Sequence, residues 1–200
     1  MGCAVTKSTI TAVKPAGGVS ANDSPVPPPA DPRLPLTMKQ RFSILSSWKG
    51  IARAMESTGV TMFIKLFQEN SDLLNLFTKF QSLNTQESQK DSMELAQHAS
   101  IVMATLDEGL RALDRVDYFI EYLESVGRFH RNIASFKKEY FWNIEQPFLA
   151  AVQETLGDRY TANMENIYKI TIHFILETIV KGFNLHDERR KSPTAIENVS

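Results

Sequence analysis

The most constraining feature of this sequence is an apolar stripe that runs through residues 117–133 and ends in a histidine. The stripe consists of Phe119, Leu123, Val126 and His130, in steps of four, three and four residues. This spacing is typical of the buried face of an α-helix. A buried imidazole must be hydrogen-bonded or hold a ligand, so His130 is either a satisfied core residue or a metal ligand.

Helical periodicity continues from Thr37 to Gly182, and no segment shows the period of two that marks a β-strand. A chain of 200 residues with 42% hydrophobic content can form one domain with a substantial core. The sequence therefore predicts an all-α fold. We expect helices over residues 38–52, from 59 past 67, 73–77, 92–110, 117–133, 136–156 and 161–182.

Several residues set the expected helix boundaries and faces. Asp91 or Ser92 is expected to cap the long helix that follows. Pro147 removes a bond to the carbonyl of Asn143 and should kink or split its helix, which Gly157 then ends. The first helix is expected to turn one stripe inward, formed by Met38, Phe42, Leu45, Trp48 and Ala52.

The two ends of the chain differ from its centre. Seven of the nine prolines fall within residues 1–36, which contain no aromatic residue. Such a segment cannot bury enough surface to fold, so we interpret it as a disordered N-terminal extension. Residues 37–184 form the expected domain, and residues 185–200 form a polar C-terminal tail.

Charge and cysteine content narrow the function classes. A net charge of −1 implies no general attraction to nucleic acid. The single cysteine, Cys3, allows no intrachain disulfide, which fits a reducing compartment. No apolar stretch has the length of a membrane span or forms the core of a signal peptide.

The chain begins Met-Gly-Cys-Ala-Val-Thr, which matches the N-myristoylation pattern with Gly2 as acceptor and Thr6 in the required place. One myristoyl chain binds membranes only marginally, with an association constant of about 10⁴ M⁻¹. Cys3 could carry a palmitoyl chain that supplies the remaining affinity. The alternative is a chance match in a flexible terminus. We expect a lipid anchor at the cytoplasmic face of the cell membrane.

A second histidine lies on the stripe of the long helix, formed by Leu95, His98, Val102 and Leu106. The other two histidines give no such signal. His173 lies off the stripe of the last helix, and His186 lies in the tail. We therefore expect His98 and His130 to lie at one site and the others at the surface.

Two imidazoles suit a flat cofactor better than a bare metal ion. A bare ion needs further ligands, and no cysteine or carboxylate shares either stripe. An iron porphyrin needs only axial protein ligands and an apolar slot. The side chains expected to build that slot are Phe63, Phe77, Phe80, Val102, Phe141 and Ile144.

The order and spacing of these residues resemble the globin family. Its landmarks are Trp48, Phe77, His98 and His130, and the resemblance covers residues 37–184. Residues 63–77 and 121–131 are similar to neuroglobin-like sequences. Together with the acylation motif, the chain resembles the membrane-attached globins called globin X. The resemblance implies a globin fold, with helices packed around a haem pocket.

The resemblance also implies roles for individual residues. His130 matches the proximal iron ligand of haem b, and His98 matches the distal histidine. Val102 and the four aromatic and aliphatic positions Phe63, Phe77, Phe141 and Ile144 match the walls of the pocket. The chain departs from the family at Ile101, where relatives often have a basic residue that reaches a haem propionate. Arg128 and Arg131 are candidates for that role.

The resemblance implies a haem protein that reversibly binds O₂, NO or CO, with His98 also on the iron when no external ligand is present. Iron with two histidine ligands favours one-electron transfer, from a membrane or cytosolic reductase. His98, once dissociated, could donate a proton, for example in nitrite reduction, and the protein could protect membranes from oxidation. The alternatives are O₂ storage or transport with His98 unligated, and a haem-free acylated interaction module.

Overall fold

The computed structural model describes residues 31–77 and 85–190, with side chains up to residue 185. Every regular element in these ranges is helical, which confirms the all-α prediction. In chain order the elements are α1 (Met38–Ala52), α2 (Met55–Glu69), the 3₁₀-helix η1 (Ser71–Leu76), α3 (Gln86–Lys90), α4 (Met93–Arg111), α5 (Val116–His130), η2 (Lys138–Ile144), α6 (Glu145–Leu156), η3 (Gly157–Arg159) and α7 (Ala162–Arg190).

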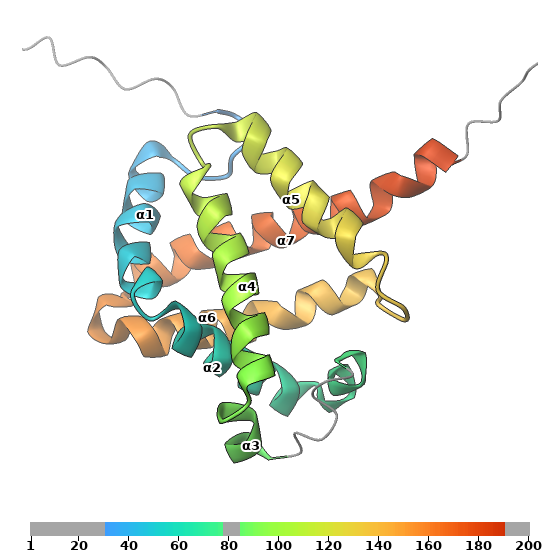
Figure 1. The fold of residues 1–200 in the computed structure, drawn as a ribbon. Helices are drawn as coiled ribbons and strands as arrows, with labels where there is room; N and C mark the ends of the chain where they lie inside the picture. Colours follow the sequence, from blue (N-terminus) through green and yellow to red (C-terminus); the bar gives the residue numbers. More distant parts are fainter. Residues whose placement is uncertain (1–30, 78–84, 191–200) are drawn as a thin grey trace, which may run out of the picture.

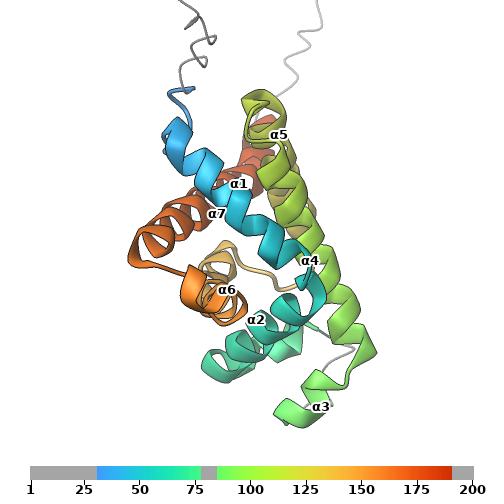
Figure 2. The same ribbon diagram turned by 90° about the vertical axis from the view of Figure 1, so that its left-hand side faces the viewer.

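Helices from both halves of the chain enclose one core. In Figure 1, α4 and α5 lie in front and α7 passes behind them, with its longest contact along α5. Figure 2 shows α6 between α7 and α2, and it packs against both. α2 also packs against α4. This arrangement brings α4 and α5, which carry the two candidate histidines, to the same core.

Side-chain caps fix where two of the helices begin. Thr37 and Gln40 form a capping box at α1, in which the Thr37 hydroxyl accepts the Gln40 N–H at 3.3 Å. The Ser92 hydroxyl accepts the N–H of Leu95 at 3.2 Å and caps α4, as one of the two predicted alternatives. Each such cap is typically worth about 1 kcal/mol, because it satisfies a donor that the helix leaves unpaired.

The predicted split at Pro147 is confirmed. The segment forms η2 up to Ile144 and then α6 from Glu145, so Pro147 falls in the first turn of α6. A proline is tolerated there because the first turn of a helix has no carbonyl partner for its N–H groups. Gly157 ends α6 with φ of 54°, a conformation that favours glycine.

The prediction that Gly59 begins the second helix is wrong. α2 begins at Met55, and Gly59 lies inside it. A Cβ at position 59 would lie 2.8 Å from Cγ of Met103 and 3.1 Å from Cβ of Ala99. The glycine therefore allows a close approach of α2 to α4, and this contact explains its place in a helix interior.

The predicted inward face of α1 is also largely wrong. Trp48 is buried as expected, but its buried neighbours on α1 are Ile44 and Ile51, both 0% exposed. The expected core residues Met38, Phe42 and Leu45 are 37%, 73% and 36% exposed. α1 carries two apolar stripes with helical spacing, and only one of them can face α6 and α7.

The packed part of the chain begins earlier than the expected boundary at Thr37. Leu34 and Leu36 belong to the core, with 6% and 3% of their surfaces exposed. The guanidinium of Arg33 contacts Asp117 at 2.7 Å and so links this segment to the first turn of α5. The buried side chains of Leu34 and Leu36 thus extend the folded domain to residues that precede α1.

The far end of the chain also differs from the expectation. α7 continues to Arg190, whereas the periodic stripe predicted an end near Gly182. Residues 1–30, including the predicted acylation sites Gly2 and Cys3, lie outside the described residues. Within the described ranges, no helix has the length and apolar character needed to cross a bilayer.

The contact between α5 and α7 is the most extensive among the described helices, and it depends on two glycines. A Cβ at Gly127 would overlap the carbonyl oxygen of Ile179, and one at Gly182 would overlap the backbone of Glu124. Beside this crossing, the buried Glu124 carboxylate binds the Lys181 ammonium at 2.8 Å. Because α5 ends at His130, the packing of α5 against α7 determines how deeply the His130 side chain lies in the core.

Candidate functional site

An apolar cavity of about 350 Å³ lies among α2, α4, α5, α6 and α7. The polar side chains on its wall are those of His98, Thr105, Ser125, His130 and Tyr140, and the others are apolar. The volume falls in the range of roughly 300–1,000 Å³ that is usual for cofactor and ligand sites. A large apolar space with a few convergent polar groups is the usual form of such a site.

His130 is the last residue of α5 and is held in one orientation by its own helix. Its Nδ1 lies 2.9 Å from the carbonyl oxygen of Val126. A carbonyl only accepts hydrogen bonds, so Nδ1 carries the proton and Nε2 keeps its lone pair. This arrangement is typical of metal-binding histidines, because the second ring nitrogen fixes the tautomer and the ring orientation.

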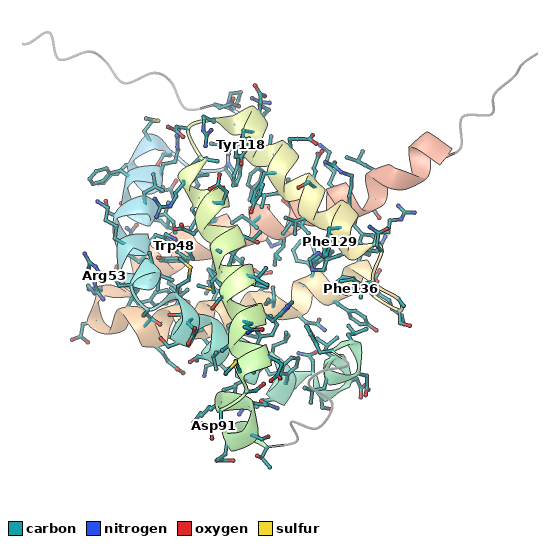
Figure 3. All side chains as sticks on the ribbon, in the orientation of Figure 1. Trp48, Arg53, Asp91, Tyr118, Phe129 and Phe136 are labelled. Atoms are coloured by element: carbon teal, nitrogen blue, oxygen red, sulfur yellow. The ribbon has the colours of Figure 1, made fainter. Side chains whose placement is uncertain are left out.

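Aromatic rings support His130 on the side away from α5. The ring centroid of Phe141, from η2, lies 5.0 Å from the imidazole, and that of Phe136 lies 5.1 Å away. Phe136 also contacts Phe141 at 5.0 Å between centroids. Figure 3 labels Phe136 and another lining residue, Phe129 near the end of α5. These rings restrict the imidazole without competing for Nε2.

His98 lies on α4 and contacts rings from two other elements. Its imidazole makes edge-to-face contacts with Phe63 of α2 at 5.1 Å and with Phe77, which follows η1, at 5.0 Å. Phe63 and Phe77 contact each other at 6.0 Å. We call the rings of Phe63 and Phe77 the aromatic cage of His98. These two rings must adjust if the His98 imidazole moves.

The neutral form is favoured for both candidate ligands, His98 and His130. Burial lowers the pKa of His98 below its ordinary value of 6.5, and the charge of nearby His130 lowers it further. Burial also lowers the pKa of His130, although its bond to Val126 opposes the shift. A neutral imidazole has the free lone pair that metal binding requires. Both rings line the same cavity.

The structure brings most of the predicted pocket residues together. Those on the cavity wall are Phe63, Phe77, Val102, Phe141 and Ile144, together with His98 and His130. Phe80, the remaining predicted residue, lies outside the described residues. Met103, next to Val102 on α4, is fully buried in the core and does not line the cavity.

Sequence reasoning missed part of the wall. Ile133 and Phe136 lie in the connection after α5, whereas the sequence predicted them at the end and at the beginning of two helices. Ile172 and Ile175 of α7 also line the cavity, and nothing in their helical spacing distinguishes a core position from a pocket position. One signal in the sequence could have assigned Phe136 to the pocket, because it lies close to His130 in the chain.

The candidate partners for a haem propionate are not on the cavity wall. Arg128 lies 2.6 Å from Glu121, and Arg131 donates to the carbonyl of Phe183 at 3.0 Å. Ile101 does line the cavity and is 64% exposed. The position that is often basic in relatives is therefore an apolar residue at the mouth of this cavity. His173, as predicted, lies at the surface with 53% of its side chain exposed.

The donor set of this cavity fits a haem. Among the described residues, no three His, Cys, Asp or Glu side chains gather to hold a metal ion. A porphyrin supplies four nitrogen ligands itself and needs only one or two axial donors, and His130 and His98 are the side chains of this cavity that would supply them. The apolar wall accommodates the macrocycle, and Nε2 of His130 is the free donor that a proximal ligand requires.

The comparisons with known proteins identify the family. The sequence model named Globin matches residues 60–179. Neuroglobin from Tetraodon nigroviridis is 27% identical over 153 residues, which cover 76% of this chain and 96% of that protein. Cytoglobin-1 from Oryzias latipes is 27% identical over 126 residues, which cover 63% of this chain and 69% of that protein.

A solved structure also matches this chain. The crystal structure of a hexacoordinated haem protein from an anhydrobiotic tardigrade, at pH 4, matches with a TM-score of 0.74 and 38% identity. The match covers 76% of this chain and 98% of that chain. The chain belongs to the globin family, and haem is its cofactor. The haem-free interaction module is therefore excluded.

Proposed function

We propose that this globin holds its haem iron with both His130 and His98 when no external ligand is present. The observation that carries the proposal is that both imidazoles line one apolar cavity, each within about 5 Å of aromatic rings that hold it. Similarity to neuroglobin and to the hexacoordinated tardigrade protein supports the same assignment.

The haem iron supplies one-electron chemistry and a binding site for O₂, NO or CO. His130 would hold the iron through Nε2. The hydrogen bond from its Nδ1 to the Val126 carbonyl keeps the imidazole ring from turning. The apolar wall excludes water and stabilises the neutral macrocycle. If both histidines remain ligands in both oxidation states, little has to reorganise during electron transfer.

His98 has a second role when it is not a ligand. Because burial keeps it neutral near pH 7, its ring offers one N–H donor to a bound ligand. We infer that this donor stabilises bound O₂. We also infer that the protonated form of His98, which becomes more populated as the pH falls, could deliver one of the two protons that, with one electron from a reductase, convert nitrite to NO and water. Protection of membrane lipids from oxidation is a further role that such redox chemistry would serve.

Replacement of each histidine tests the iron ligation. His130→Ala should lose haem on a desalting column, whereas His98→Ala should keep haem but show ferrous, gas-free visible bands that are broad instead of resolved. His173→Ala is the matched control, because that histidine lies at the surface. If the wild type and His98→Ala have the same ferrous spectrum, His98 does not bind the iron. That result would favour the alternative function, storage or transport of O₂.

We also propose that the protein is anchored to the cytoplasmic face of the cell membrane by acyl chains on Gly2 and Cys3. The sequence motif supports this, together with the lone cysteine beside the acceptor glycine. Metabolic labelling with alkyne-tagged myristate and palmitate should modify the wild type. Gly2→Ala should abolish the myristate label, and Cys3→Ser should abolish the palmitate label. Equal recovery of wild type and both variants in the soluble fraction would contradict the anchor.

A further inference from the structure

The outer face of α1 carries an apolar cluster that no described element covers. Met38, Phe42 and Leu45 are spaced by four and three residues, so they lie on one side of the helix. Phe42 is 73% exposed, more than any other large hydrophobic side chain in the described ranges. Isolated exposed apolar residues are common, but a cluster on one helix face marks an interaction site.

The charges around this cluster are positive. Lys39 and Lys49 are exposed on α1, and Arg53 is the exposed residue that caps its end, where Figure 3 labels it. The fifteen residues of α1 include no aspartate or glutamate. The exposed face of α1 is thus a small amphipathic surface with an apolar centre and a cationic border.

Carboxylates approach the cluster at its first residue. Met38 borders a hollow that also contains Asp31, Asp114 and Asp117. Three guanidinium groups line the same hollow, and one of them, that of Arg33, contacts Asp31 at 2.8 Å and Asp117 at 2.7 Å. These charges balance one another, so the positive border given by Lys39, Lys49 and Arg53 is not cancelled.

We propose that this face of α1 docks on an anionic lipid bilayer. In the docked state, Met38, Phe42 and Leu45 would enter the boundary between headgroups and acyl chains. The basic side chains around them would contact lipid phosphates. Helices that lie in the membrane interface combine these two features, and anionic lipids attract basic residues near the surface.

The chain's own N-terminal segment fits this face less well. Residues 1–30 contain Lys7, Lys14 and Asp23 as their only charged side chains, so they add positive charge to a face that is already positive. They also contain no aromatic residue. Charge complementarity therefore favours an anionic partner over this segment.

A second copy of the chain is also a poor occupant. A stable protein interface usually takes about 20–30 residues on each side. The cluster offers three apolar residues, and two copies placed face to face would oppose their basic borders. A bilayer needs no matching shape and supplies the opposite charge.

The chain order places this face near any membrane that holds the N-terminus. Residues 4–30 separate the predicted acylation sites from the first described residue, Asp31, and α1 begins at Met38. A segment of this length can span at most about 90–100 Å. A tether of that reach raises the local concentration of the face at the bilayer, so a weak contact is sufficient.

The docking surface and the proposed acyl anchor are tested separately. The full, haem-loaded chain made without acyl chains is mixed with vesicles of phosphatidylcholine, alone or with phosphatidylserine, and then sedimented. We expect binding to the anionic vesicles that salt weakens. Phe42→Ser should weaken it about tenfold, because most of that ring would leave water on docking. Lys49→Gln should weaken it about fivefold. Met93→Ser is the control, since Met93 is 72% exposed on α4 and should have no effect.

A site-specific probe gives a second readout. Cys3 is the only cysteine, so a Cys3→Ser background with Phe42→Cys accepts one environment-sensitive dye on α1. The same background with Met93→Cys is the control. Emission from position 42 should shift to the blue on anionic vesicles, and emission from position 93 should not.

Three results would overturn the docking surface while leaving haem ligation and acylation intact. One is equal vesicle binding by wild type and Phe42→Ser. Another is an unchanged emission at position 42 on anionic vesicles. The third is a dimer, seen by light scattering without lipid, that Phe42→Ser abolishes, because the occupant would then be a second copy.

Discussion

Replacement of Gly127 by alanine should separate α5 from α7 and destabilise the haem site. The added Cβ would overlap the carbonyl oxygen of Ile179 and lie 2.6 Å from the amide nitrogen of Phe183. Ordinary contacts between carbon and a carbonyl oxygen are about 3.3 Å or longer. Both neighbours are backbone atoms of α7, so no rotamer change relieves the contact. One helix must therefore move by an ångström or more.

The magnitude follows from two opposing effects. Alanine gains up to about 1 kcal/mol over glycine in a helix interior. Overpacking typically costs 1–3 kcal/mol and costs more when the backbone has to move. We therefore expect Gly127→Ala to lower the free energy of unfolding by about 3 kcal/mol, the upper part of that range.

Gly109→Ala is the matched control in α4. A Cβ there would lie 3.5 Å from Cε2 of Phe119 and 3.7 Å from Cδ2 of Leu123, which are ordinary contacts. Its stability should stay unchanged or rise by up to about 1 kcal/mol.

Urea unfolding of the haem-free proteins, followed by circular dichroism, measures both variants without a contribution from haem binding. Haem transfer to an apoprotein acceptor is the second assay, because α5 positions His130 three residues after Gly127. Gly127→Ala should release haem faster than wild type. Equal unfolding free energies for the alanine variants at positions 127 and 109 would refute the reasoning.

Three further predictions concern the pocket, the core and a helix cap. Phe63→Ala removes a 2% exposed ring from the cage around His98, and should lower the unfolding free energy by about 3–5 kcal/mol in urea. Burial raises the pKa of Tyr168 to about 12, so the unfolded state loses this proton first as the pH rises above 10. Wild type should lose about 3 kcal/mol between pH 10 and 12, a loss that Tyr168→Phe should not show. Ser92→Ala removes the cap of α4 and should cost about 1 kcal/mol in thermal unfolding.

The sequence was sufficient for the features that depend on local chemistry. Helical spacing placed His98 and His130 on inward faces, because periodicity reports directly which residues share a side of a helix. Pro147 marked the division between η2 and α6, and Ser92 was one of the two predicted caps of α4. These signals need no knowledge of how the helices pack.

The failures all depend on contacts between segments distant in the chain. Gly59 was taken for a helix start, but its role is the approach of α2 to α4. Phe42 was placed in the core, because spacing alone does not say which of two apolar stripes on α1 is covered. Phe136 was predicted to begin a helix and was not assigned to the pocket, because the sequence does not show that the connection after α5 packs against His130. Tertiary packing decides each of these outcomes.

The cage around His98 has a consequence for ligand binding. If His98 binds the iron as proposed, its imidazole must leave the iron before an external ligand can bind, and it must do so within a space bounded by Phe63 and Phe77, both within about 5 Å of it. The size of these two rings therefore sets how readily the distal histidine moves. In a protein with both histidines on the iron, that movement limits the rate at which O₂ or CO can bind.

The most direct measurement of two-histidine ligation is the low-temperature electron paramagnetic resonance spectrum of the ferric protein near neutral pH. We predict a low-spin signal in the wild type, with no added ligand, that His98→Ala converts to a high-spin signal. A high-spin signal from the wild type would show that His98 does not bind the iron and would contradict the proposal.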